Sequence, residues 1–257
     1  MNNTFNLNRF GRLFIKHTIE HYKNYLMSLS VLLGVMILGG SFIVYMIDIP
    51  MEVQMQLALF AIMLVLAGTI FTSTVFADIG DNKKAITSLT LPAAHFEKYL
   101  VAWLYSYLFF LAIYTICFYL VMLFLTAIKH FPGQHTEIFN IFHKDGGYQI
   151  YLFYAFLHSI AFCGAIFFQK LHFIKTAFIF FIGIAILIIG NNMIQQEMLG
   201  RNVMMNAPFG GVRFIENNRA AYIGITNGQQ AYILMLLGAI ALVFWIAAYF
   251  RLKEKQV

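Results

Sequence analysis

Six long apolar stretches dominate this sequence, at about residues 25–47, 53–76, 100–128, 148–169, 173–194 and 229–250. Each has the roughly 20 mainly apolar residues that a helix needs to cross a bilayer. Strands of a membrane barrel would alternate apolar and polar residues, and these stretches do not. The chain is 61% hydrophobic and 11% charged, which is more apolar than a water-soluble domain of 257 residues needs to be. The sequence therefore predicts an all-α polytopic membrane protein, with six transmembrane helices in a single domain.

Lys and Arg are unevenly divided between the two sides that these spans define. One side has twelve of the 17, namely Arg9, Arg12, Lys16, Lys23, Lys83, Lys84, Lys98, Lys170, Lys175, Arg251, Lys253 and Lys255. The other side has Lys129, Lys144, Arg201, Arg213 and Arg219. Because positive side chains are retained in the cytoplasm, the richer side is predicted to be cytoplasmic, with both termini inside. The net charge of +6 then reflects this bias and contact with membrane lipids, and it does not indicate a nucleic-acid partner.

The N-terminal residues 6–24 have the pattern of an amphipathic helix. Basic side chains recur at helical spacing at Arg9, Arg12 and Lys16, while Phe10 and Phe14 belong to an apolar cluster across from them. Such a helix is expected to lie in the membrane interface. Two interpretations stay open for it: a membrane-surface anchor alone, or an anchor that also forms part of a docking surface for a partner.

A charged segment, residues 77–99, separates the second and third spans. It holds six of the 28 charged residues: Asp78, Asp81, Lys83, Lys84, Glu97 and Lys98. Pro92 suits the first turn of a helix, so a helix is predicted to begin there, with Glu97 and Lys98 in a polar lead-in to the third span. Apolar residues in the segment, such as Leu91, favour a folded structure over a solvated one. An ordinary cytoplasmic loop is the alternative.

The last external loop, residues 195–228, is long for a segment without structure. Two short apolar runs, 212–215 and 222–225, flank the turn-forming residues 216–219, which suits a small β-hairpin. Alternatively, residues 195–205 continue as a short helix near the outer face of the membrane.

The chain lacks the sequence motifs of common catalytic and nucleotide-binding sites. It has no Gly-x-x-x-x-Gly-Lys-Ser/Thr loop, no Gly-x-Ser-x-Gly, no His-Glu-x-x-His and no Cys-x-x-Cys. No enzyme activity and no cofactor are expected in this chain, so energy from a nucleotide must come through another subunit. Cys117 and Cys163 both fall inside predicted spans and are expected to be small buried residues.

Histidines are the candidate side chains for a metal site or a proton relay. His130, His135 and His143 share one external loop, but their spacing matches no tight chelate, and no metal site is expected. His158 is the ionisable residue inside the fourth span. A lone histidine in a span more often bonds to a neighbouring helix than relays protons, and this is the expectation for His158.

The segment 89–98, Leu-Thr-Leu-Pro-Ala-Ala-His-Phe-Glu-Lys, follows a Phe-x-Asp-x-Gly stretch at 76–80. It resembles the permease subunits of type-2 ATP-binding-cassette (ABC) exporters, whose bacterial members carry a Leu-Pro-small-small-x-x-Glu-Lys pattern between spans two and three. The length, the N-terminal interfacial helix, the six spans and the lack of an ATPase motif are similar too.

This resemblance implies a transporter in the bacterial cytoplasmic (inner) membrane. Two permease chains, either two copies or two related chains, would work with two ABC ATPase subunits that bind ATP and Mg. The segment 77–99 would carry the coupling helix that docks on the ATPase, with the N-terminal helix at the same surface. The expected coupling residues are Asp78, Asp81, Leu91, Pro92, Glu97 and Lys98, and those of the interfacial helix are Arg9, Phe10, Arg12, Phe14 and Lys16.

The mechanism that the resemblance implies is export by alternating access, from the cytoplasm or the inner leaflet. No polar site in the spans identifies the substrate. Two other classes of protein are alternatives. The first is a six-span protein that does not transport, such as an immunity or assembly factor. The second is an intramembrane enzyme, which would need polar groups that converge in one pocket; the only candidates lie together in one loop.

Overall fold

The computed structural model describes residues 5–47, 51–75, 93–128, 137–141, 147–168, 171–200, 203–206, 208, 210–216, 219–224 and 227–254. Within these ranges, six helices are long and apolar enough to cross a membrane. The prediction of a polytopic, all-α membrane protein is therefore confirmed.

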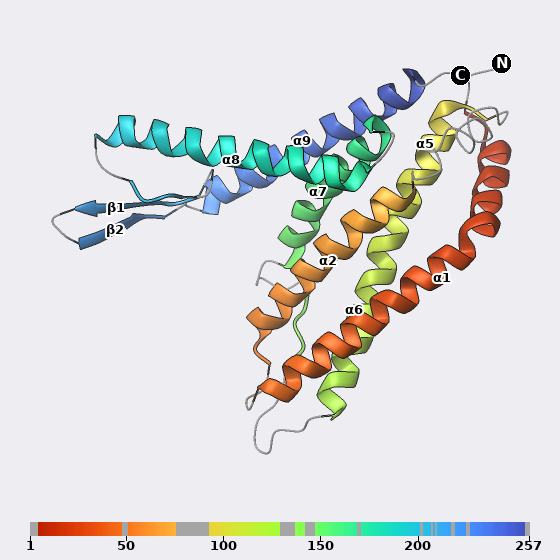
Figure 1. Ribbon diagram of the computed structural model, residues 1–257, viewed down its shortest axis with the longest axis horizontal. Coiled ribbons are helices and arrows are strands. Elements are labelled where there is room, and N and C mark those ends of the chain that lie inside the picture. The colour runs from red at the N-terminus through yellow and green to blue at the C-terminus, as the bar shows by residue number, and fades with distance from the viewer. Residues whose placement is uncertain are drawn as a thin grey trace.

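The elements follow one another as a series of long helices with one small hairpin. They are α1 (Leu7–Met46), α2 (Val53–Val75), α5 (His95–Trp103), the π-helical segment η1 (Leu104–Phe109), α6 (Phe110–Ile128), α7 (Gly147–Phe167), α8 (His172–Leu199), β1 (Val212–Glu216), β2 (Arg219–Ile223) and α9 (Asn227–Glu254). The segments α5, η1 and α6 form one continuous helix that contains the third span. Figure 1 shows the start of α1 and the end of α9 at the same end of the molecule.

Helix α1 combines the predicted interfacial helix and the predicted first span in one helix of 40 residues. At 1.5 Å per residue it is about 60 Å long, roughly twice the thickness of the hydrocarbon core. About half of the helix must therefore extend beyond that core, and its first turns carry the charges. Figure 1 shows that α1 changes direction between these first turns and its long second part. The side chain of Asn6 begins the helix by accepting the backbone N–H groups of Asn8 and Arg9.

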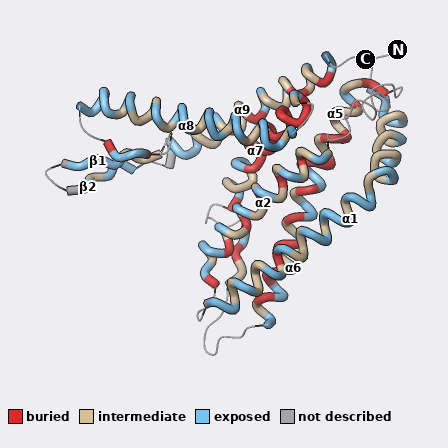
Figure 2. Tube along the Cα trace, viewed as in Figure 1, coloured by how far each residue is buried: buried red, intermediate tan, exposed pale blue. Residues whose placement is uncertain are grey.

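Two groups of buried side chains hold the helices together. The first, called here the distal core, joins α1, α2, α6 and the first half of α7; its larger members are Met36, Phe60, Leu64, Phe110, Tyr114, Phe118, Met122, Leu125, Phe139, Ile141 and Tyr154. The second, called here the junction core, joins α5, the second half of α7 and α9; its members are Tyr99, Ala102, Phe162, Cys163, Ala165, Ile166, Ala248 and Leu252. Figure 2 shows the buried residues concentrated along α2, α5, α6 and α7.

Helix α8 and the hairpin extend away from these cores (Figure 1). No residue of α8 is buried against the part of the chain that the structure describes. Strands β1 and β2 pair antiparallel from Val212 with Ile223 to Glu216 with Arg219, so the predicted hairpin is confirmed. Residues 195–199 belong to α8 rather than to the predicted loop, and the helix ends at Gly200, whose φ of 59° suits glycine.

Candidate functional site: the junction of helices α1 and α5

The carboxylate of Glu97 determines where α5 begins. The sequence predicted a helix start at Pro92, but α5 begins at His95, after Ala94. The backbone N–H of Ala94 donates to Oε2 of Glu97 at 3.2 Å, while the N–H of Glu97 donates to the carbonyl oxygen of Ala94 at 3.0 Å. A glutamate in the third position of a helix satisfies an N–H group that has no partner within the helix, and its charge opposes the positive helix end. Glu97 therefore stabilises the start of α5, which lies three residues after Pro92 and ahead of the predicted third span.

The same carboxylate binds the beginning of α1. Oε1 accepts the backbone N–H of Asn6 at 2.9 Å and Nη2 of Arg9 at 2.7 Å, while Oε2 accepts Nε of Arg9 at 2.7 Å. The contact between the guanidinium and the carboxylate is thus bidentate, the strong form of this pair. We call the group Asn6, Arg9, Ala94 and Glu97 the Glu97 junction.

The Glu97 junction is closed to solvent on the glutamate side. The side chain of Glu97 is 0% exposed and that of Arg9 is 31% exposed. A buried carboxylate is tolerated only when it is paired and hydrogen-bonded, and here four donors surround it. Glu97 was predicted to lie in a polar lead-in to the third span, and the structure buries its side chain there among these donors. Because its side chain is buried, Glu97 positions α1 against α5 and does not itself present a surface to a partner.

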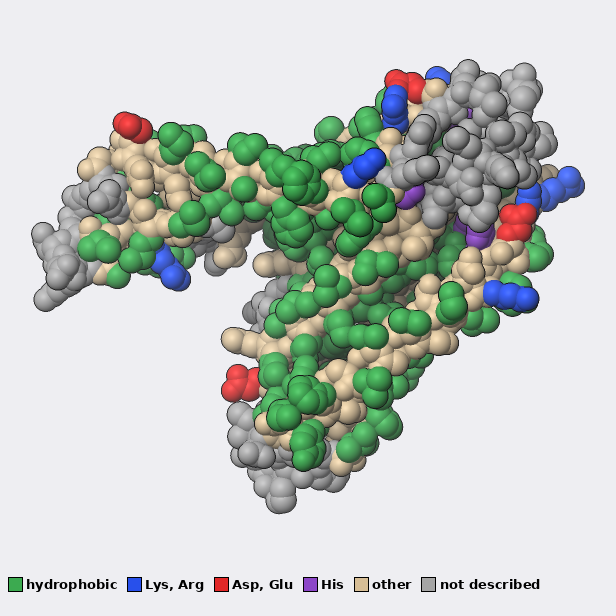
Figure 3. Space-filling model, viewed as in Figure 1, with side chains coloured by type: hydrophobic (Ala, Val, Ile, Leu, Met, Phe, Trp, Pro, Cys, Tyr) green, Lys and Arg blue, Asp and Glu red, His purple; other side chains and the backbone are tan. Residues whose placement is uncertain are grey.

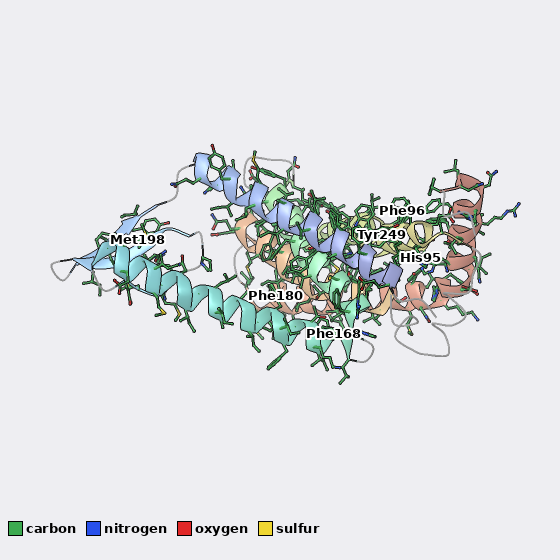
Figure 4. All side chains as sticks on the ribbon, turned by 90° about the horizontal axis from the view of Figure 1, so that it is seen from above. His95, Phe96, Phe168, Phe180, Met198 and Tyr249 are labelled. Carbon is green, nitrogen blue, oxygen red and sulfur yellow. The ribbon has the colours of Figure 1, made fainter. Side chains whose placement is uncertain are left out.

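Aromatic rings surround the Glu97 junction and connect it to α9. The ring of Phe96 makes edge contacts with Phe5, at 6.0 Å between centroids, and with Tyr249, at 5.9 Å. Tyr249 also contacts Tyr99, whose hydroxyl donates to the carbonyl oxygen of Trp245 at 2.9 Å. Figure 4 shows Phe96 and Tyr249 together with His95, where the end of α9 meets the start of α5. The N-terminal residues, α5 and the end of α9 are therefore one packed unit.

Tyr105 of η1 contacts α1 at residues farther along that helix. Phe14 stacks on Tyr105 at 5.0 Å between centroids, and Tyr25 stacks on it at 5.4 Å. The hydroxyl groups of Thr18 and Tyr105 are hydrogen-bonded. The first half of α1 thus lies along α5 and η1 over several turns.

The structure describes seven of the predicted coupling and interfacial residues and brings four of them together here. Arg9 and Glu97 form the ion pair, and Phe14 packs on η1, as described above. Phe10 lies between Phe5 and Phe14, at 5.8 and 6.4 Å between ring centroids. The remaining described residues of this set are the exposed Arg12, the half-buried Lys98, and Lys16, which pairs with Glu20 at 3.6 Å. Asp78, Asp81, Leu91 and Pro92 lie outside the described residues.

Charged side chains gather at the end of the molecule where the Glu97 junction lies. Figure 3 shows Lys, Arg, Asp, Glu and His side chains around this end, while hydrophobic side chains cover most of the visible shaft. An ion pair between exposed groups, such as Lys16 with Glu20, contributes little to stability. Among the charged side chains that the structure describes at this end, that of Glu97 is the buried one.

A second polar group, around His158, lies deeper in the protein. His158 is 0% exposed; its Nδ1 accepts Nε1–H of Trp245 at 3.2 Å, and its Nε2 lies 3.0 Å from Oγ of Ser106. An indole nitrogen can only donate, so Nδ1 is the acceptor, and Nε2 carries the proton that it donates to Ser106. The expectation that His158 bonds to neighbouring helices is confirmed. Asn192 of α8 accepts the backbone N–H of Asn206 at 3.3 Å, outside the helical bundle.

The described part of the chain contains no group of three or more His, Cys, Asp or Glu side chains that could hold a metal ion. His130, His135 and His143 lie outside the described residues. Cys117 and Cys163 are buried and unpaired with each other, as the sequence indicated.

Comparison with protein-family models, with curated proteins and with solved structures finds no match to this chain.

Proposed function

We propose that this chain is the permease subunit of an ATP-driven exporter of the type-2 ABC class. It would work with a separate ATPase subunit, which binds ATP and Mg, and with a second permease chain, either another copy or a related chain. In this proposal the end with the Glu97 junction faces the bacterial cytoplasm. Alternating access then moves a substrate outward from the cytoplasm or the inner leaflet of the bilayer.

The observation that carries the proposal is the attachment of α1 to the start of α5 by a buried carboxylate. The segment 77–94 precedes α5 directly in the sequence, and in this proposal a partner that moves this segment moves α5 with it. Because Glu97 binds both Arg9 and the backbone of Asn6, the first turns of α1 follow α5. A segment transmits force to a bundle only if the helices it joins move as a unit, and this junction supplies such a unit.

Two observations support the assignment of residues 77–99 as the coupling segment: the sequence motif at 89–98 and the buried Glu97 junction. The Leu-Pro-Ala-Ala-His-Phe-Glu-Lys sequence resembles the coupling segment of these permeases. Its Glu97 is the residue that binds the N-terminal helix. In this proposal the glutamate of the motif positions α1 against α5, and exposed residues around it contact the ATPase.

The test is copurification from the native operon in mild detergent, with identification of the associated proteins. We expect a stoichiometric soluble ATPase with a phosphate-binding loop, with less of it recovered on Glu97→Gln. Glu254→Gln is the matched control, because Glu254 pairs with Arg251 at the same end of the molecule but is 65% exposed. Purification of the chain without a nucleotide-binding partner, in several detergents and in lipid nanodiscs, would overturn the proposal.

A further inference from the structure

Helix α7 passes from one core to the other. Tyr154 belongs to the distal core, whereas Phe162 and Ile166 belong to the junction core. His158 stands midway between Tyr154 and Phe162, one helical turn from each. The border between the two cores therefore crosses α7 at His158.

The continuous helix α5–η1–α6 crosses the same border. Tyr99 and Ala102 of α5 belong to the junction core, and Phe110 of α6 belongs to the distal core. The segment between them, Leu104–Phe109, is the π-helix η1. A π turn accommodates one extra residue in a helix, is rare, and is often found where a helix bends or functions. The irregular turn thus lies at the boundary between two separately packed units.

The His158 hydrogen bonds join the two helices and α9 at this border. Ser106, the partner of Nε2, is inside the π turn, and Trp245, the partner of Nδ1, is on α9 beside the junction core. Tyr107 of the π turn packs its ring 5.0 Å from that of His158 and 5.4 Å from that of Trp245. His158 is therefore the polar contact at which α7, α9 and the π turn meet.

We propose that the π turn Leu104–Phe109 is a hinge on which the junction core turns against the distal core, and that the hydrogen bond from His158 to Ser106 holds one of its two positions. A turn with one extra residue can pass that residue to the next turn and so reorient α5 while the flanking helices remain intact. Ser106 belongs to the turn that changes, whereas Trp245 belongs to α9, so the Ser106 bond is the one that breaks. The hinge itself does not depend on the proposed function. Only its role rests on that function: the motion would transmit a displacement of the Glu97 junction to the distal core.

The test removes the extra residue. Leu108 is 49% exposed, so deleting it converts the π turn into a regular α-helix with little loss of buried contact. Leu108→Ala is the matched control, because it removes the same side chain and keeps the π turn. Spin labels at Phe250 on α9 and Ile62 on α2, both more than half exposed, report the distance between the two cores. The labels are introduced as cysteines in a background with both native cysteines changed to alanine, in lipid nanodiscs without an ATPase.

We expect two distances in the parent protein and in Leu108→Ala, and one distance in the deletion variant. Ser106→Ala keeps the π turn and is expected to change the ratio of the two populations about five-fold, the effect of one neutral hydrogen bond. A single distance in all variants would overturn the hinge. So would two distances whose populations change neither on deletion of Leu108 nor in Ser106→Ala. If the deletion variant fails to fold, the ratio of the two distance populations in Ser106→Ala decides whether the hinge exists. Because no ATPase is present, failure here leaves the proposed function standing, and failure of the copurification leaves the hinge standing.

Discussion

Replacing Glu97 by glutamine removes the charge from the Glu97 junction while keeping the size of the side chain. The amide oxygen, placed as Oε1, can still accept from Asn6 and from Nη2 of Arg9. The amide NH₂ then stands where Oε2 accepted Nε of Arg9 and the backbone N–H of Ala94. Two donors thus face a third donor, and the remaining bond to Arg9 loses its charge.

The cost of this substitution follows from the burial of each group. The N–H of Ala94 is buried, and leaving such a donor unsatisfied costs about 1–3 kcal/mol. Arg9 is 31% exposed, so water can replace its lost partner, and losing the charge on the remaining bond adds only about 1 kcal/mol. The docking of the first turns of α1 on α5 should therefore weaken by about 2–4 kcal/mol.

Hydrogen exchange measured on the protein in lipid nanodiscs reports this docking. Undocked first turns of a helix fray, so their amides should exchange about 30-fold to 900-fold faster in Glu97→Gln than in the parent protein. The change should be confined to the first turns of α1 and to the start of α5, with α6 and α7 unaffected. Glu254→Gln, which alters an exposed pair with Arg251, should leave these amides unchanged. Unchanged exchange at the start of α1 in Glu97→Gln would refute the role given to the buried carboxylate.

Three further predictions follow from single side chains. Arg9→Lys should loosen the first turns of α1 in the same exchange measurement, though less than Arg9→Ala does, because a lysine cannot make the two parallel bonds of a guanidinium. Tyr114→Phe should lower the free energy of unfolding by about 1 kcal/mol in detergent, because the buried hydroxyl loses its bond to a carbonyl of α2; Tyr45→Phe, at a residue 79% exposed, is the control and should have no effect. Cys117 and Cys163 should resist a maleimide in the folded protein and react fully after denaturation, and labelling of either in the folded state would contradict their burial.

The spans could be predicted from the sequence because contact with lipid restricts the amino-acid composition of a helix. Segments that face hydrocarbon must be mainly apolar, so each predicted span matches a helix to within a few residues, apart from the extensions at the start of α1 and α5 and at the end of α8. The hairpin was also predictable, since residues 216–219 are typical of a turn between apolar runs. The continuity of α1 was readable too, because no proline or glycine stands between Gly11 and Gly34.

The Glu97 junction could not be predicted, because its partners are 88 residues apart in the sequence. A charged residue beside a membrane span is ordinarily solvated, whereas this one is paired with Arg9 and Asn6 through the tertiary approach of α1. The start of α5 carried no clear local signal either, because Ala94 has no side chain that can accept a hydrogen bond at the helix start. The π turn had no signal, since one extra residue in an apolar helix leaves the composition unchanged.

The most direct test of the account is hydrogen exchange on the copurified complex, with and without ATP and Mg. The account predicts that nucleotide changes the protection of α5 and of the first turns of α1 together, and that Glu97→Gln leaves the change in α5 but removes it from α1. If neither segment responds to nucleotide, or if α1 responds as fully in Glu97→Gln as in the parent protein, the Glu97 junction is not the link between the ATPase and the membrane helices.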